Sequence, residues 1–521
     1  MESKLFNKLD GLLNEEKFDE ARALIGESFK NVSFDAGPES LLLILKLYGF
    51  LTDIGNESQN EKDLCDSIDF YEKHEELIQN CITKASYYYD LANAKQGLSK
   101  IFYTNNKGVH PISITKIHFQ EPIKLYWLAY KNIEDKNEDL FLQILINLSN
   151  SLITANRIVE GLQFLDIVLR TIPGFPQALI SRGDSLDYLS KVTNCAVTIS
   201  LYAQIYQSYN DGIRTNTLPP SILLRSAQNR EQALNTIEEN GFRAEQIEEE
   251  IQESQKEFEN HTDFRKYCIY YFLTLNEHGI YCNCVATKKD DLQIGVKNAM
   301  FKGDIIPQLE LLLNRIKSEF ALARWLYYQS LQPRSPVEED TMFTELLDGE
   351  VINSQTELQR TSFRLCYGLL DKIALGICKL YNLDSKRIHF EIFWEDKKRN
   401  EQLNLIRNIH LNALYSIASD LNTKTGELKQ FKNWRNDLEH NLLVLKDTSK
   451  IDLDILKLFK DRNFVEVADA EDFTSKTLHL LQLTRAAIFS FVYCVRLETI
   501  HEKNDNQKKN RFMMGFKRIK N

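Results

Sequence analysis

The sequence has little glycine and proline, with 20 Gly and 10 Pro among 521 residues. These two residue types supply the tight turns that an all-β fold or a protein rich in glycine loops requires. Their scarcity favours a mostly helical chain. The hydrophobic fraction of 43% and the charged fraction of 26% are ordinary for folded globular proteins. The length allows several domains, each with a core of its own.

The sequence also lacks the features of secreted and membrane proteins. Its nine cysteines are an odd number without the spacing of a disulfide framework. The first residues carry acids where a signal peptide needs an apolar run, and nowhere do about 18 apolar residues follow one another. We therefore expect a cytoplasmic protein that does not span a membrane.

Three common enzyme signatures are missing: the G-x-x-x-x-G-K-[ST] phosphate loop, the G-x-S-x-G elbow and the H-E-x-x-H helix. ATPases, α/β-hydrolases and zincin proteases are therefore poor interpretations. A net charge of -10 argues against coating nucleic acid through bulk charge, so any RNA site must be local. The basic tail, residues 501–521, is either a contact to RNA phosphates or a disordered solubilising end.

Helical pairs are expected over residues 1–230. Apolar residues recur at helical spacing on both sides of a polar break in residues 5–29, which predicts a helical hairpin. Residues 141–186 resemble tetratricopeptide repeats, and residues 87–98 resemble another first helix of such a unit, whereas residues 105–121 do not keep the period. The positions that carry the repeat resemblance at a period of ~34 residues are Leu148, Gly161, Val168, Pro173 and Gly183.

Stacked repeats of this kind usually present a groove to a partner. A protein partner or trigger is therefore expected at the repeat groove. The alternative is that these helices only pack against the rest of the chain.

Residues 231–345 are predicted to be a charged helical connector and middle segment. Residues 228–260 read as an acid-rich helix with a solvated face. Residues 264–286 are dense in aromatics and lack a clean period, which indicates a buried strand-like or irregular piece. A strong helical stripe returns over residues 305–331.

His278, Cys282 and Cys284 are residue types that bind zinc, and they lie close in the sequence. A structural zinc site normally has a second, well-spaced pair of ligands, and none is evident. We interpret the thiols as small core residues. Neither a metal ligand nor a cofactor is predicted.

The C-terminal part, residues 346–500, is expected to form a four- or five-helix bundle. Its predicted helices cover residues 351–383, 403–421, 428–445 and 473–497. The third contains FKNWRNDLEHN, in which Arg435, Asn436 and His440 stand near the expected start of an apolar helix.

This pattern resembles the R-N-x-x-x-H signature of HEPN-superfamily ribonucleases, and the upstream sequence FRLCYGLLDKIA resembles one HEPN branch. That branch joins N-terminal tetratricopeptide-like repeats to a C-terminal HEPN domain. The resemblance implies an all-α, metal-independent endoribonuclease that cleaves RNA as a homodimer. It further implies a conditional effector of a bacterial toxin or anti-phage defence system, controlled by the repeat region.

The chemistry explains these residue types. His440 can transfer a proton near neutral pH, and Arg435 can grip two phosphoryl oxygens. Five residues of helix place the two about 140° apart, so one chain alone does not put both on one face. The homodimer implied by the resemblance would let one chain complement the other. Asn436 shares a face with His440, and Asp371 either holds Arg435 or His440 in place or faces water.

The same residues are also consistent with less specific interpretations. The motif is also consistent with a solvated helix start capped by Asn433. His410 and His479 are expected to be surface or satisfied core histidines. The alternative function is a catalytically silent HEPN and repeat scaffold or a nucleotide-binding module.

Overall fold

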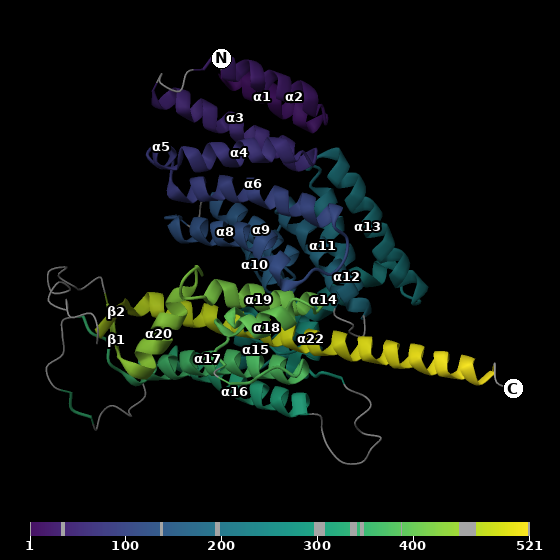
Figure 1. Ribbon diagram of the computed structural model, residues 1–521, viewed down its shortest axis with the longest axis vertical. Helices are drawn as coiled ribbons and strands as arrows, with labels where there is room; N and C mark the ends of the chain where they lie inside the picture. The colour runs from purple at the N-terminus through teal and green to yellow at the C-terminus, as the bar shows by residue number, and fades with distance from the viewer. Residues whose placement is uncertain are drawn as a thin grey trace. The chain divides into compact units, whose positions relative to one another are not determined.

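The computed structural model describes residues 2–32, 37–135, 139–192, 198–295, 308–333, 341–343, 349–386, 388–447 and 465–518. Helices form nearly all of the regular structure in these ranges, as Figure 1 shows. The predicted all-α fold is confirmed. The chain divides into two compact units, one of Met1–Tyr188 with Tyr202–Ala244 and one of Leu189–Leu201 with Glu245–Asn521.

The first unit is a stack of helices that follow one another in chain order (Figure 1). From α1 to α4, and onward through α6, α8, α9 and α10, each helix packs against the next. The helices are α1 (Glu2–Asn14), α2 (Phe18–Lys30), α3 (Pro38–Glu57), α4 (Glu61–Lys73), α5 (Glu75–Gln79), α6 (Lys84–Asn105), α7 (Ile112–Ile114), the π-helix η2 (Thr115–Phe119), α8 (Gln120–Asn132), α9 (Asp139–Thr154), α10 (Ile158–Thr171), α11 (Pro176–Val192), α12 (Ile199–Arg214) and α13 (Pro220–Glu239).

Local chemistry sets several of these boundaries. The Asn60 side chain accepts hydrogen bonds from two backbone amides of the first turn of α4, and Thr83 caps α6 in the same way through the amide of Ser86. The hairpin predicted at the start of the chain is present as α1 and α2. These two helices share a buried core with α3, formed by Leu9, Leu12, Ala21, Ile25, Leu47, Leu51 and Ile54.

Gly161, one of the positions that carry the repeat resemblance, lies where α10 crosses α9. A Cβ atom there would lie 2.5 Å from Ile153 Cγ1 and 3.0 Å from the Ser149 carbonyl oxygen. The Ser149 hydroxyl also donates a hydrogen bond of 2.8 Å to the Gly161 carbonyl. Gly183 is also close to a neighbouring helix, because its Cβ would lie 2.9 Å from Tyr209. The glycines of the repeat pattern therefore permit close helix crossings.

The second unit has two long helices at its centre, α17 (Ser354–Leu380) and α22 (Ala470–Arg518). They pack against each other, and a Cβ at Gly376 would lie 2.6 Å from the Phe491 ring. Around them lie α14 (Ala244–Glu257), η3 (Phe258–Asn260), α15 (Asp263–Tyr270), η4 (His278–Ile280), η5 (Val285–Lys288), α16 (Gln308–Ser330), η8 (Phe393–Glu395), α18 (Lys397–Leu403), α19 (Ile409–Leu421), α20 (Lys429–His440), β1 (Leu442–Lys446) and β2 (Val465–Asp469).

The structure corrects three predicted elements. The helix expected over residues 228–260 is two helices, since α13 ends at Glu239 and Gly241 has a φ of +87°. The helix expected over residues 428–445 ends at His440, and β1 follows it. Residues 264–286 begin as α15 and continue as an irregular segment with short 3₁₀ turns.

Helix α16 packs tightly on α17 and belongs to the same compact unit. An ion pair of 2.8 Å joins Lys372 of α17 to Glu319 of α16. A domain boundary near residue 345 would separate these two packed helices, and residues 344–348 themselves lie outside the described residues. The sequence placed the end of the repeat region at residue 230, and the first compact unit extends to Ala244.

Within the described residues, one helical stretch, Ala470–Thr499 of α22, is long and apolar enough to cross a membrane. Of the most apolar 18-residue window in this stretch, 83% is buried inside the protein, which is typical of a core helix. The basic tail continues α22 as far as Arg518, and residues 519–521 lie outside the described part.

We predict that Gly161→Ala destabilises the first unit although alanine favours helices. The added Cβ would collide with Ile153 and the Ser149 carbonyl, and overpacking of this kind typically costs about 1–3 kcal/mol. The matched control is Gly26→Ala in the exposed middle of α2, where a Cβ meets nothing within 4 Å. That variant should gain up to about 1 kcal/mol from helix propensity. Thermal unfolding of the two variants decides it, and equal shifts would contradict the close crossing.

Candidate functional site

Two aromatic side chains anchor α20. Phe431 and Trp434 are buried, and their rings lie 6.1 and 6.3 Å from the ring of Phe363 on α17. Trp434 also lies 5.4 Å from Phe473 on α22. Because these rings stand on one side of the helix, other positions reach solvent, among them Asn433, Glu439 and His440.

The motif closes α20 rather than opening it. Asn441 ends the helix, with its amide N–H donating to the Asp437 carbonyl and its side chain donating to the Asp437 carboxylate at 3.0 Å. The next five residues form β1, which pairs in parallel with β2. Asn433 lies inside the helix, so the interpretation of a helix start capped by Asn433 is wrong.

The structure separates the two proposed reacting residues. Arg435 is half-buried, and its guanidinium donates a hydrogen bond of 3.3 Å to the Asn436 side chain. His440 is exposed at the C-terminal end of α20. Five residues of helix separate them by about 7.5 Å along the axis and about 140° around it. Arg435 and Asn436 therefore lie together, and His440 stands apart from Arg435.

Asp371 does not hold Arg435 or His440. Its carboxylate accepts a hydrogen bond of 2.8 Å from the Phe390 backbone amide, and His389 Nδ1 lies 3.9 Å away. Burial is the main cause that raises the pKa of Asp371, and the hydrogen bond from Phe390 opposes it. Asp371 thus fixes the chain after α17, and its side chain keeps 27% of its exposure to solvent.

Sequence reasoning missed a buried polar cluster beside Arg435. Lys432 and Glu391 are both buried and form an ion pair of 2.5 Å. Tyr367 lies next to them, with its hydroxyl buried and without a hydrogen-bond partner in the described part of the chain. Burial raises the pKa of Tyr367 most, Glu391 and Asp371 raise it further, and the Arg435 charge lowers it. Arg435 thus stands at the edge of this cluster.

One signal pointed to part of this cluster. Lys432 precedes Arg435 by three positions and Asn436 by four, so the side chain of Lys432 is expected to neighbour both on the helix surface. Glu391 gave no signal, because it lies in an irregular segment.

Comparison with known families gives a match within the second compact unit. Residues 300–498 match the LA2681-like HEPN family. The chain carries a HEPN domain. The match includes α16, α17, α19 and the whole of α20 with Arg435 and His440. A search of the curated proteins found no match. The predicted superfamily is confirmed, and HEPN domains are often ribonucleases.

The HEPN domain holds one histidine in its core. His410 is buried, and its Nε2 atom donates to the Val192 carbonyl at 3.0 Å. Burial is the main cause that lowers the pKa of His410 to about 4. This is the satisfied core histidine that the sequence indicated, and it is too enclosed to exchange protons with a substrate.

His410 gives the second unit a predicted pH dependence. Because its pKa is about 4 when folded and about 6.5 when unfolded, the unfolded chain binds more protons between these values. The contribution of neutral, buried His410 to the free energy of unfolding is therefore fully present above pH 6.5. It is lost as the pH falls from 6.5 toward 4. The expected loss from this group between pH 8 and pH 5 is about 2 kcal/mol. Denaturant unfolding at both pH values should show a smaller loss in His410→Gln, and an equal loss would rule out this origin.

Proposed function

We propose that the HEPN domain is a metal-independent endoribonuclease in which Arg435 and His440 act on RNA. The observation that carries the proposal is the position of both residues on one anchored helix, where His440 is exposed and Arg435 borders a buried polar cluster. An anchored helix presents its polar side chains in a fixed geometry, which proton transfer requires.

The reaction uses the RNA's own nucleophile. The 2′-hydroxyl attacks the adjacent phosphorus, its proton passes to a base, and the bond to the 5′-oxygen breaks as that oxygen gains a proton. His440 serves one of these proton transfers. Arg435 stabilises the added negative charge on the phosphoryl oxygens with its planar guanidinium. The products are a 2′,3′-cyclic phosphate and a 5′-hydroxyl.

A two-fold homodimer would complete the site. The two residues point to different sides of α20, so a second copy can bring its own His440 toward Arg435 of the first. Leu442 supports this arrangement, because it is 45% exposed two residues after His440 and offers apolar surface beside the motif. A two-fold interface would place the same patch of each copy against the other.

The repeat unit would then decide when the nuclease acts. Its stacked helices are of the kind that bind partners, and a sensor joined to an RNA-cleaving domain suits a conditional bacterial toxin or anti-phage effector. The competing function, a silent scaffold or nucleotide-binding module, uses the same fold without chemistry. RNA cleavage separates the two.

We predict that Arg435→Ala and His440→Ala each abolish RNA cleavage and leave folding intact. Loss of a proton-transfer group typically costs ~10²–10⁴ in rate, whereas truncation of a partly or fully exposed side chain should change stability by under about 1 kcal/mol. The matched control is Lys429→Ala, an exposed cation on the same helix, which should keep activity. Cleavage of a mixed tRNA and rRNA pool is measured beside circular dichroism and sedimentation. Folded variants with full activity would refute the assignment.

Mixing the two inactive variants tests the shared site. One heterodimer site would combine an intact Arg435 from one chain with an intact His440 from the other, so partial activity should return.

The wild-type reaction should also proceed in EDTA and give 2′,3′-cyclic phosphate ends, because an internal 2′-hydroxyl needs no Lewis acid. Products with 5′-phosphates that require added magnesium would indicate a two-metal nuclease.

A further inference from the structure

The irregular segment between α15 and α16 brings together His278, Cys282 and Cys284. Their ligand atoms all lie within 4.8 Å of one another, and His278 Nε2 is 3.0 Å from Cys284 Sγ. Around a tetrahedral zinc with Zn–N of about 2.0 Å and Zn–S of about 2.3 Å, ligand atoms stand about 3.5–3.8 Å apart. Small side-chain movements would therefore be enough to admit the ion.

Hydrogen bonds prepare these atoms to act as ligands. His278 Nδ1 lies 3.2 Å from the Tyr281 hydroxyl, which in turn contacts the Thr198 hydroxyl at 2.8 Å. With the proton on Nδ1, His278 donates to Tyr281 and keeps the lone pair of Nε2 for a metal. The backbone amide of Cys284 donates to the Cys282 sulfur, and that of Ala286 donates to the Cys284 sulfur, so both sulfurs are held in place by the loop backbone.

The backbone around the cluster is held by polar side chains of its own. Asn276 is buried, donates to the carbonyls of Ala286 and Lys289 and accepts from the Gly279 amide. His261 Nε2 lies 3.2 Å from the Cys284 carbonyl. Such a backbone limits the ordering that a bound ion must impose.

We propose that His278, Cys282 and Cys284 bind a zinc ion. Two thiolates and an imidazole are the donors that zinc prefers. In the part of the chain that the structure describes, no fourth side-chain ligand joins the cluster, so water takes the fourth position. The ion would fasten a segment that is docked on α22, where Arg485 donates to the Thr274 carbonyl and Arg496 pairs with Glu277 at 2.7 Å.

Metal analysis of the full-length protein tests this proposal. After loading with zinc and dialysis, the wild type should hold about one zinc per chain, and Cys282→Ser/Cys284→Ser should hold none. The matched control, Cys65→Ser/Cys81→Ser, removes two free thiols of the first unit and should keep the zinc. His278→Gln should bind at least tenfold more weakly, which keeps the test valid if the double variant fails to fold.

Cobalt gives a second readout that does not depend on activity. Loading with Co²⁺ should produce a thiolate-to-cobalt charge-transfer absorption in the wild type and in Arg435→Ala, because the proposal does not rest on catalysis. Absence of zinc and cobalt binding by the reduced protein would overturn it. So would a Cys282–Cys284 disulfide in protein purified under reducing conditions.

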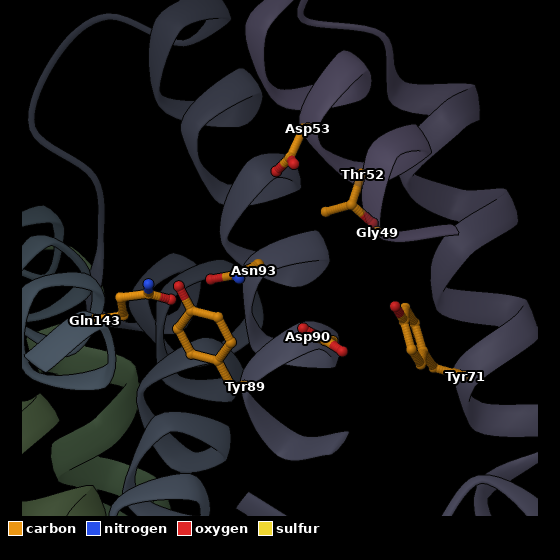
Figure 2. Close-up of a pocket in the computed structure, with 8 residues that line it drawn as sticks. All are labelled: Gly49, Thr52, Asp53, Tyr71, Tyr89, Asp90, Asn93 and Gln143. Carbon is orange, nitrogen blue, oxygen red and sulfur yellow. The ribbon is translucent and has the colours of Figure 1, made fainter. Parts of the chain in front are cut away.

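A separate observation in the first unit supports a second proposal. A cavity of about 210 Å³ opens among helices of the repeat stack (Figure 2). Asp53 of α3 and Asp90 of α6 face it, and within the described residues the charged groups that shift the pKa of each are acids and not a basic partner. The remaining lining residues are Gly49, Thr52, Tyr71, Tyr89, Asn93 and Gln143.

Two buried hydroxyls in this cavity lack partners. Tyr71 is 0% exposed and Thr52 is 3% exposed, and within the described part of the chain neither hydroxyl has a hydrogen-bond partner. Figure 2 shows the Tyr71 hydroxyl directed toward the space between the two carboxylates. A buried polar group without a partner costs free energy, which a bound donor or acceptor would recover.

We infer that the cavity binds a small organic cation with a primary ammonium or guanidinium group. Asp53 and Asp90 would accept its N–H donors, and the rings of Tyr71 and Tyr89 offer faces to its charge. The size of the cavity suits a diamine or a single basic side chain. Binding of such a cation in the first unit would not require RNA cleavage by the HEPN domain.

Calorimetric titration of the full-length protein with putrescine tests the cavity, with 1,4-butanediol as the uncharged probe of similar length. Putrescine should bind saturably and butanediol should not. Asp90→Asn and Asp53→Asn should each weaken binding at least tenfold, whereas Asp66→Asn, an exposed acid of α4, should not. Equal binding by all variants, or none by the wild type, would overturn the inference.

The affinity should also rise from pH 6 to pH 8. Burial is the main cause that raises the pKa of both Asp53 and Asp90 to about 7, with Glu57 and Asp10 adding to the effect at Asp53 and the Asp53 charge adding to it at Asp90. Higher pH therefore ionises the two acceptors of the cation. A flat profile would contradict their role.

Discussion

The contact of Phe431 and Trp434 with Phe363 and Phe473 is the constraint on which the HEPN site depends. Helix α20 has 12 residues, a length at which an isolated helix is marginal in water. Burial of two aromatic rings against the rest of the unit adds the stabilisation that the helix propensity of the segment does not provide. It also fixes the rotation of the helix about its axis. That rotation decides which side chains reach solvent. This packing therefore places Arg435 beside the buried face of the helix, four residues after Phe431, and His440 on the opposite, exposed side.

Local patterns were sufficient to predict that α20 exists, but they could not locate its end. The apolar run LLVLK after His440 reads as a continuation of the helix, because nothing in the run itself breaks one. It forms β1 because β2, which follows about twenty residues later, pairs with it in parallel. Such pairing is non-local, and a sequence period carries no information about it. The site therefore lies at a junction between helix and strand.

The same limit applies to the partners of the motif. Arg435, Asn436 and His440 were found because they belong to one short pattern. Asp371 was expected either to hold Arg435 or His440 or to face water. It accepts a hydrogen bond from the Phe390 amide, because the irregular segment after α17 folds back on that helix. The ion pair between Lys432 and Glu391 joins that segment to α20 and had no sequence signal. Residues that share one helix form a pattern that the sequence displays, whereas contacts between separate elements leave no such pattern.

Helix α22 connects these features physically. Through Phe473 it contacts Trp434 and so supports α20, and through Arg485 and Arg496 it holds the segment that carries His278, Cys282 and Cys284. An ion bound by the segment would restrain the same helix against which α20 is packed. The cysteine cluster and the motif are far apart in the sequence, but α22 contacts the elements that carry both.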